Sequence, residues 1–90
     1  MNKTWSDEAW EDEAWEDYVD WQTEDKKTLK RINLILKDVE RHPFEGIGKP
    51  EPLKGDLGGF WSGRINEKNR LVYRIVPSGL EILSCKGHYE

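Results

Sequence analysis

The feature that most constrains how this chain can fold is a segment rich in glycine and proline near its middle. Between residues 43 and 59 there are eight such positions: Pro43, Gly46, Gly48, Pro50, Pro52, Gly55, Gly58 and Gly59. Proline removes a backbone donor and glycine raises the entropic cost of ordering, so neither a helix nor a central strand is expected here. We predict a long ordered loop or flap, a kind of segment that often carries function on a rigid scaffold.

Upstream of this segment the hydrophobic spacing predicts two helices joined as an αα-hairpin. The second is expected over about 25–41, and its apolar face comprises Leu29, Ile32, Ile35, Leu36 and Val39. It ends before Pro43, so His42 is a helix-end residue. A histidine at such a position more often contacts the last carbonyls of the helix than takes part in catalysis. The first helix follows Ser6, a suitable N-cap. Its apolar stripe comprises Trp10, Ala14, Tyr18 and Trp21.

The start of the first helix contains a perfect tandem repeat. Residues 7–11 and 12–16 both read Asp-Glu-Ala-Trp-Glu. Five residues advance an α-helix by roughly 140° beyond a full turn, so the two copies cannot face the same way. Either the helix has gained a turn with Trp10 still on the apolar stripe, or the first copy bulges between a preceding strand and the helix. We favour the extended helix.

Downstream of the glycine-rich segment three short strands are expected, over about 60–66, 70–76 and 80–86. Their connections have the composition of hairpin turns. Residues 1–5 can add a short edge strand. The predicted fold class is therefore α+β: one domain over residues 1–90, with a two-helix hairpin packed on a twisted antiparallel β-sheet.

The cysteine content and the distribution of apolar residues indicate the cofactors and the cellular location to expect. The single cysteine, Cys85, cannot form an intrachain disulfide, and no Cys/His cluster has zinc spacing. We therefore expect no metal or other cofactor and a reducing, cytoplasmic location. Neither an apolar run of membrane-spanning length nor a signal-peptide pattern is present.

Charge is divided unevenly along the chain. Residues 1–25 carry ten acidic side chains and one lysine, a net charge of −9, whereas residues 26–90 carry thirteen Lys/Arg and eight Asp/Glu, a net charge of +5. Such asymmetry hints at contact with nucleic acid. The alternative is that acidic residues simply complement a helix N-terminus and the rest is an ordinary surface.

A basic sheet face is the first candidate for an RNA contact. Leu71, Tyr73 and Ile75 alternate along the strand from residue 70 with Arg70, Val72 and Arg74, so one face is apolar and the other carries two arginines. Arg64 of the preceding strand shares the polar face, and Lys54 approaches from the flap. This pattern suits an RNA backbone, although exposed arginines are also common on solvated sheets.

Four residues supply groups for cleaving RNA without a metal. Cleavage by the 2′-hydroxyl of the RNA needs a base, a cation for the phosphoryl oxygens and an acid for the leaving group. Glu51 offers a carboxylate, Arg70 a guanidinium, His88 an imidazole and Tyr89 a phenol. Each also has a structural explanation, because Glu51 lies in a stiff Pro-Glu-Pro loop and His88 and Tyr89 lie in a tail.

Longer sequence matches point to one family. The chain resembles the YoeB/Txe toxins of the RelE superfamily, bacterial toxins paired with a YefM-type antitoxin. The run 43–54 is the most specific match. The other matching segments are 5–10, 17–22, 30–33, 59–62, 70–73 and 88–89, so that nearly the full length is covered.

The resemblance implies both fold and chemistry. It implies the α+β fold predicted above and a ribosome-dependent endoribonuclease that cuts the mRNA codon in the A site, without metal or cofactor. Glu51 is expected to be the general base, His88 the general acid, Arg70 the transition-state cation and Tyr89 an orienting group. Contacts to phosphate or ribosomal RNA are expected from Lys49, Lys54, Arg64 and Arg74. The expected partners are a YefM-type antitoxin, the ribosome with its mRNA, and a second copy in a homodimer.

Several positions depart from the family pattern. The second pentad is unusual, Gly63 replaces the first of two paired arginines, and Gly87 replaces an aromatic residue before His88. Glu90 adds a carboxylate that would favour a protonated imidazole and repel phosphate. A flexible Gly87 can also loosen the imidazole, and misplacement of a catalytic group can cost on the order of 100-fold in rate. The alternative function is thus an attenuated homologue that binds antitoxin or ribosome without efficient cleavage.

Overall fold

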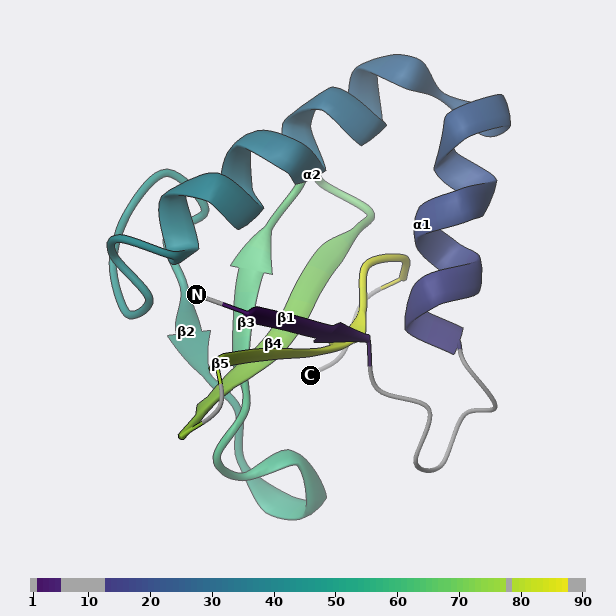
Figure 1. The fold of residues 1–90 in the computed structure, drawn as a ribbon. Helices are drawn as coiled ribbons and strands as arrows, with labels where there is room; N and C mark the ends of the chain where they lie inside the picture. Colours follow the sequence, from purple (N-terminus) through teal and green to yellow (C-terminus); the bar gives the residue numbers. More distant parts are fainter. Residues whose placement is uncertain (1, 6–12, 78, 88–90) are drawn as a thin grey trace.

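The computed structural model describes residues 2–5, 13–77 and 79–87, in which two helices lie against a five-stranded sheet (Figure 1). The helices are α1 (Glu13–Glu24) and α2 (Lys26–Val39), and a 3-10 turn, η1, spans Gly55–Leu57. The strands are β1 (Asn2–Trp5), β2 (Glu51–Pro52), β3 (Trp61–Arg64), β4 (Arg70–Val76) and β5 (Gly79–Ser84). No helix in these described ranges is long and apolar enough to cross a membrane.

The sheet has the strand order β1-β5-β4-β3-β2. Strands β3 to β5 pair antiparallel, as predicted; β2 adds to β3 antiparallel, and β1 pairs with β5 in parallel. The short edge strand expected at the N-terminus is therefore present, and its direction is set by a partner almost eighty residues away. One irregularity interrupts the β4–β5 ladder between Val72 and Tyr73, where Leu83 of β5 is left without a partner.

Helix α2 covers one face of the sheet and supplies much of the core (Figure 1). Its predicted apolar face is confirmed: Ile32, Ile35, Leu36 and Val39 are buried, and Leu29 is half-buried against them. They pack on Leu71 and Tyr73 of β4 and on Leu80 and Ile82 of β5. The predicted bounds of 25–41 were slightly long, because Asp25 is the N-cap and the helix ends at Val39.

The junction between the helices is a single residue, Asp25. Its Oδ1 accepts from the amides of Lys27 (3.0 Å) and Thr28 (3.3 Å), and its Oδ2 accepts from the Thr28 hydroxyl (2.8 Å). These bonds satisfy donors that the first turn of α2 would otherwise leave open. They also lower the pKa of the Asp25 carboxyl, the Thr28 side chain making the largest contribution.

Helix α1 is described from Glu13, within the second pentad. The Ser6 cap and the first pentad lie outside the described residues, so the register of Trp10 stays a prediction. Trp21, in the predicted apolar stripe, is only 6% exposed and belongs to the core, with Tyr18 packed beside it. The acidic side chains Glu16, Asp20 and Glu24 face solvent.

The glycine- and proline-rich segment is an ordered loop, but it also contains a strand that the prediction missed. Glu51 and Pro52 form β2 against β3, and η1 follows. Two bonds tie the loop to the sheet: Arg64 N donates to Gly48 O (2.7 Å) and Tyr73 Oη donates to Pro43 O (2.5 Å). Burial raises the pKa of the Tyr73 phenol strongly, so this hydroxyl remains a donor.

Candidate active site on the polar sheet face

The face of the sheet opposite α2 brings several predicted site residues together. Paired residues of neighbouring antiparallel strands point to the same side. The register therefore aligns one row across four strands: Glu51, Ser62, Val72 and Ser84. Arg64 and Arg70 form the neighbouring row on one side of it. Arg74 and Glu81 form the neighbouring row on its opposite side, two residues after Val72 along β4.

Glu51 is held on this face by β2. Its side chain is exposed, and its backbone is flanked by Pro50 and Pro52. Leu53 N donates to Phe60 O (2.9 Å), which continues the pairing with the segment before β3. Two strand spacings and two residues along β4 separate Glu51 from Arg70, so their Cα atoms lie roughly 12 Å apart. Extended side chains on both sides of a phosphodiester can span this separation.

Arg70 is half-buried at the start of β4, and its guanidinium is directed toward the turn before it. Its Nη1 donates to the carbonyls of Asn66 and Asn69, the latter at 3.1 Å. Asn66 Oδ1 organises the same turn by accepting from the amides of Lys68 (2.9 Å) and Asn69 (2.8 Å). These contacts fix the position of the guanidinium, and its other nitrogens donate to no acceptor among the described residues.

Gly87, after β5, is hydrogen-bonded to Arg70 and Asn69. Arg70 N donates to Gly87 O (2.8 Å), and Gly87 N donates to Asn69 Oδ1 (2.9 Å). Gly87 adopts φ +85°, a conformation that other residues rarely adopt, and a Cβ at this position would meet no atom within 4 Å. Glycine therefore suits the backbone conformation at this position. His88, Tyr89 and Glu90 lie outside the described residues.

Helix α1 holds the residues just before Gly87. Trp21 Nε1 donates to Cys85 O (2.9 Å), and Cys85 N donates to Asp17 Oδ2 (3.3 Å). Lys86 Nζ binds Glu24 Oε2 at 2.7 Å and lies 5.3 Å from the Trp21 ring centroid. Cys85 is fully buried, and this burial raises the pKa of its thiol strongly. Residues 85–87 are therefore fixed by α1 on one side and by Asn69 and Arg70 on the other.

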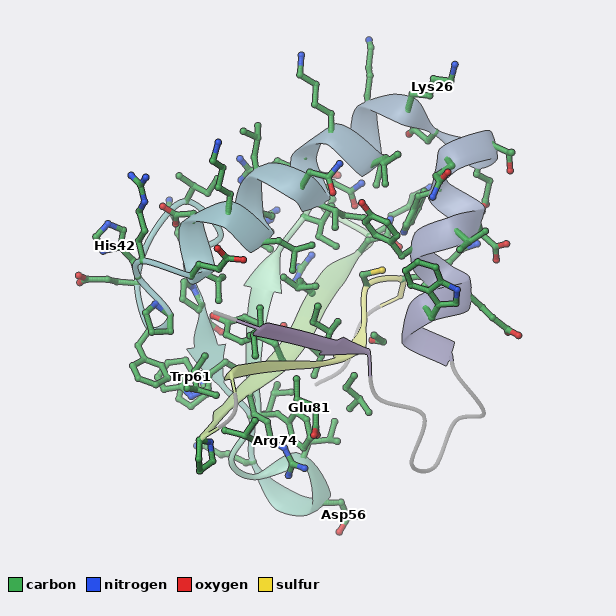
Figure 2. The ribbon with its side chains drawn as sticks, viewed as in Figure 1. Lys26, His42, Asp56, Trp61, Arg74 and Glu81 are labelled. Atoms are coloured by element: carbon green, nitrogen blue, oxygen red, sulfur yellow. The ribbon has the colours of Figure 1, made fainter. Side chains whose placement is uncertain are left out.

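The other predicted basic residues differ in their surroundings. The side chains of Lys49, Lys54 and Arg64 are exposed. Arg74 instead pairs with Glu81 at 2.7 Å and stacks 4.8 Å from the Phe60 centroid (Figure 2). Its charge is offset by Glu81, so Arg74 is the least available of the four to a phosphate. Val72 is also fully buried, so the polar face is not open along its whole length.

His42 lies apart from this face, as expected of a helix-end residue. It occupies the far end of α2, away from Arg74 and Glu81 (Figure 2), and its amide donates to Asp38 O at 2.8 Å. Its side chain is exposed.

Gly63 does not belong to the polar face. A Cβ built on Gly63 would lie 3.7 Å from Tyr73 Cε1 and 3.8 Å from Ile35 Cγ2, so a side chain here points into the core. The departure from paired arginines therefore removes no group from the row that contains Arg64 and Arg70. It affects core packing instead.

Asn69 and Trp21 were not among the predicted site residues. Both position the chain end through bonds to residues far away in sequence, and a local pattern contains no signal for such contacts. The turn composition around Asn66 and Asn69 did predict a hairpin, but not its bond to Gly87.

The fold and this face define a small α+β protein that presents a carboxylate and arginines on one side of its sheet. Comparison with known proteins identifies the group to which it belongs. The profile of the family described as "YoeB-like toxin of bacterial type II toxin-antitoxin system" matches residues 10–89. The chain belongs to this family, and it is a toxin of the YoeB/RelE kind.

Three relatives illustrate the similarity. Toxin YoeB of Escherichia coli (strain K12) is 54% identical over 89 residues, covering 99% of this chain and 100% of the relative. A solved YoeB–YefM complex from Staphylococcus aureus superposes with a TM-score of 0.84 at 46% identity, and a YoeB dimer from the same organism with 0.86 at 47%. Each of these two covers 99% of this chain and 98% of the solved chain.

Proposed function

We propose that this toxin is a ribosome-dependent endoribonuclease that cleaves mRNA in the A site and so inhibits translation. The observation that carries the proposal is the common face of Glu51, Arg64 and Arg70, with Gly87 bonded beside Arg70, in a chain of the YoeB-like family. The reaction is transesterification: the 2′-oxygen attacks phosphorus and forms a 2′,3′-cyclic phosphate as the bond to the 5′-oxygen breaks.

In this mechanism Glu51 accepts the proton of the 2′-hydroxyl. Its exposed position on an edge strand leaves it accessible to a nucleotide, and its flanking prolines restrict the backbone. Arg70 stabilises charge on the phosphoryl oxygens through the nitrogens that the turn does not occupy. A fixed cation of this kind stabilises the transition state because it needs no reorientation as charge develops.

His88 donates the proton to the 5′-oxygen, and Tyr89 orients the phosphate. The support for His88 is its covalent link to Gly87, since consecutive Cα atoms are about 3.8 Å apart. Gly87 is bonded to both Asn69 and Arg70, so the residue that precedes His88 lies beside the proposed transition-state cation. Lys49, Lys54 and Arg64 contact phosphates of mRNA or ribosomal RNA, and Arg74 contributes least.

The proposed partners follow from the same family. A YefM-type antitoxin neutralises the toxin, as the S. aureus complex suggests by its composition, and a homodimer is proposed from the S. aureus dimer. The site of action, and hence the location, is the cytoplasm, where ribosomes and mRNA are found.

A second candidate is a homologue that binds antitoxin or ribosome without efficient cleavage. The tandem pentad favours it, because five extra residues in the first helix can disturb the packing of that helix on the sheet. Gly63 does not support this candidate, since it faces the core.

Primer extension in a purified bacterial translation system tests both candidates. Wild-type protein is compared with Glu51→Gln, Arg70→Ala and His88→Ala, with and without ribosomes. The proposal expects ribosome-dependent cuts in A-site codons that fall by at least tenfold in each variant. Ribosome binding without cuts by the wild type favours the second candidate. Cuts of equal rate in all variants would refute the assigned chemistry.

A further inference from the structure

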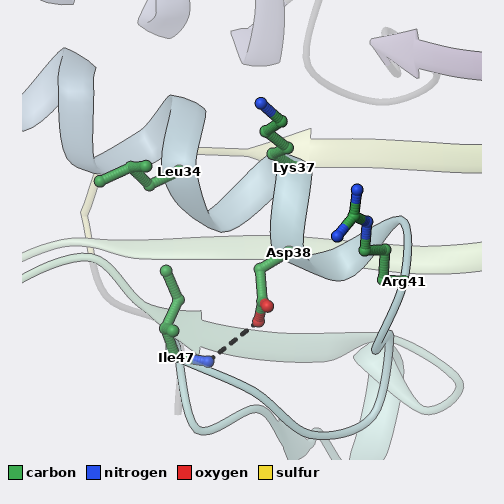
Figure 3. A pocket seen from close by; sticks show the side chains of 5 residues that line it. All are labelled: Leu34, Lys37, Asp38, Arg41 and Ile47. Carbon is green, nitrogen blue, oxygen red and sulfur yellow. Dashed lines mark hydrogen bonds between the residues drawn. The ribbon is translucent and has the colours of Figure 1, made fainter.

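A pocket on the outer side of α2 is not explained by the proposed function. It has a volume of about 240 Å³ and is lined by Leu34, Lys37, Asp38, Arg41 and Ile47 (Figure 3). Leu34, Lys37 and Asp38 lie on one side of α2, at spacings of three and four residues, and Arg41 follows in the turn after the helix. Ile47 contributes the opposite wall from the loop that follows the helix. We call this site the α2–loop pocket.

The floor of the α2–loop pocket is apolar and exposed. Leu34 is 50% exposed and Ile47 is 44% exposed, although both are large hydrophobic side chains. Figure 3 shows the two reaching into the same space from the helix and from the loop. Single exposed hydrophobic residues are ordinary, but two that share a pocket provide a place for an apolar group from a partner.

The rim of the pocket is positively charged. Lys37 and Arg41 stand on one side of it, and neither has an ion-pair partner among the residues that the structure describes (Figure 3). The one acidic group, Asp38, is bonded through Oδ2 to the amide of Ile47 at 3.0 Å. Arg31 adds a further cation, because its Nη2 donates to Ile47 O at 3.2 Å. Lys37, Arg41 and Arg31 together with Asp38 therefore carry a net charge of +2.

The loop wall is preformed rather than dependent on a ligand. Arg31 and Asp38 hold the backbone of Ile47 on both its carbonyl and its amide. Gly46 permits the close approach: its φ is +129°, and a Cβ there would lie 2.0 Å from Asp38 Oδ2. Lys49 N also donates to Gly46 O at 3.0 Å. A preformed site loses less entropy on binding.

We propose that the α2–loop pocket binds an acidic segment of a partner protein that inserts one bulky apolar side chain. The apolar side chain packs between Leu34 and Ile47, and flanking carboxylates pair with Lys37 and Arg41. A volume of about 240 Å³ falls below the range of roughly 300–1,000 Å³ typical of small-molecule sites, and suits one side chain of a peptide.

A protein segment is favoured over RNA for two reasons. The floor offers aliphatic surface, whereas single-stranded RNA is bound by aromatic rings and cations. The Asp38 carboxylate also lies within the pocket, where it would repel a continuous phosphate backbone more than a few spaced carboxylates. The pocket is on the α2 side of the sheet, opposite Glu51, so the inference goes beyond the proposed function and does not depend on it.

Peptide binding measured by fluorescence anisotropy tests the proposal on the folded full-length protein. The probe is a labelled acidic decapeptide with the sequence Asp-Glu-Ala-Trp-Glu-Asp-Glu-Ala-Trp-Glu, which combines carboxylates with apolar anchors. We expect Lys37→Glu and Leu34→Asp each to weaken binding at least tenfold. Lys26→Glu is the matched control, because Lys26 is exposed on the same helix outside the pocket. The substitution changes the net charge by the same amount as Lys37→Glu. It should weaken binding less than twofold.

Two further probes separate an anchored peptide from general charge attraction. A peptide with both tryptophans replaced by alanine should bind at least fivefold more weakly than the original peptide. A uridine decanucleotide should lose no more affinity for the Leu34→Asp variant than for the Lys26→Glu variant. Equal effects of Lys37→Glu and Lys26→Glu would overturn the proposal. So would absence of peptide binding at millimolar concentration, or a larger effect of Leu34→Asp on the oligonucleotide than on the peptide.

Discussion

The bond from Trp21 to the end of β5 gives a sharp prediction for Trp21→Phe. The substitution keeps an aromatic ring at a position only 6% exposed but removes Nε1, which donates to Cys85 O at 2.9 Å. Cys85 is fully buried, so its carbonyl loses a partner that water does not readily replace. Such a loss costs about 1–3 kcal/mol. For a chain of this size each kcal/mol lowers Tm by about 4–8 °C.

Urea unfolding followed by far-ultraviolet circular dichroism measures the effect without relying on tryptophan fluorescence. The matched control is Trp15→Phe, the same substitution on the same helix at a side chain that is 48% exposed. It should change the free energy of unfolding by less than about 0.5 kcal/mol. If Trp21→Phe is no more destabilising than Trp15→Phe, the claim that α1 holds the chain end through this bond is refuted.

Three other variants test the remaining arrangement. Asn69→Ala removes the acceptor of the Gly87 amide. It should lower the rate of the proposed mRNA cleavage by up to roughly 100-fold with little change in KM, and Asn69→Asp, which keeps an acceptor, should partly restore the rate. Equal rates of the two variants in kinetic assays would contradict a positioning role. Tyr73→Phe leaves Pro43 O without its donor and should lower the free energy of unfolding in urea by about 1–3 kcal/mol. Since folding raises the pKa of the phenol, the wild type should also lose stability as pH rises above about 10, and the variant should lose less stability over the same pH range. Asp25→Ala should lower Tm at pH 7, and because folding lowers the carboxyl pKa this difference should shrink as pH falls below about 4; a difference independent of pH would argue against the cap.

Local patterns in the sequence correctly predicted the meander, α2 and the described part of α1; the start of the first helix, before Glu13, stays a prediction. The apolar spacing identified the buried face of α2, and alternation identified Leu71 and Tyr73 as core residues of β4. The same alternation did not predict the burial of Val72. That burial depends on the position of β4 in the middle of a five-stranded sheet, with Ser62 and Ser84 on either side.

The sequence did not predict the features that organise the candidate site, because one is a very short strand and the others are long-range hydrogen bonds. A strand of only two residues, one of them a proline, gives no signal in the sequence, so β2 was interpreted as part of a loop. The bonds among Asn69, Arg70 and Gly87 join the start of β4 to the chain end, and no spacing within either segment indicates them. The resemblance supplied Glu51 and Arg70 as candidates, and the register of β2, β3 and β4 shows that they share a face.

The parallel pairing of β1 with β5 determines when during synthesis the protein can fold. Asn2–Trp5 pairs with residues 79–82 of β5, and α1 binds the backbone of Cys85, so these early elements have partners more than sixty residues later in the sequence. Contacts of such high sequence separation form late and slowly. A nascent chain that lacks β5 has neither the sheet edge for β1 nor the anchor for Trp21. Folding of this domain must therefore wait until β5 and Cys85 have left the ribosome that makes the chain.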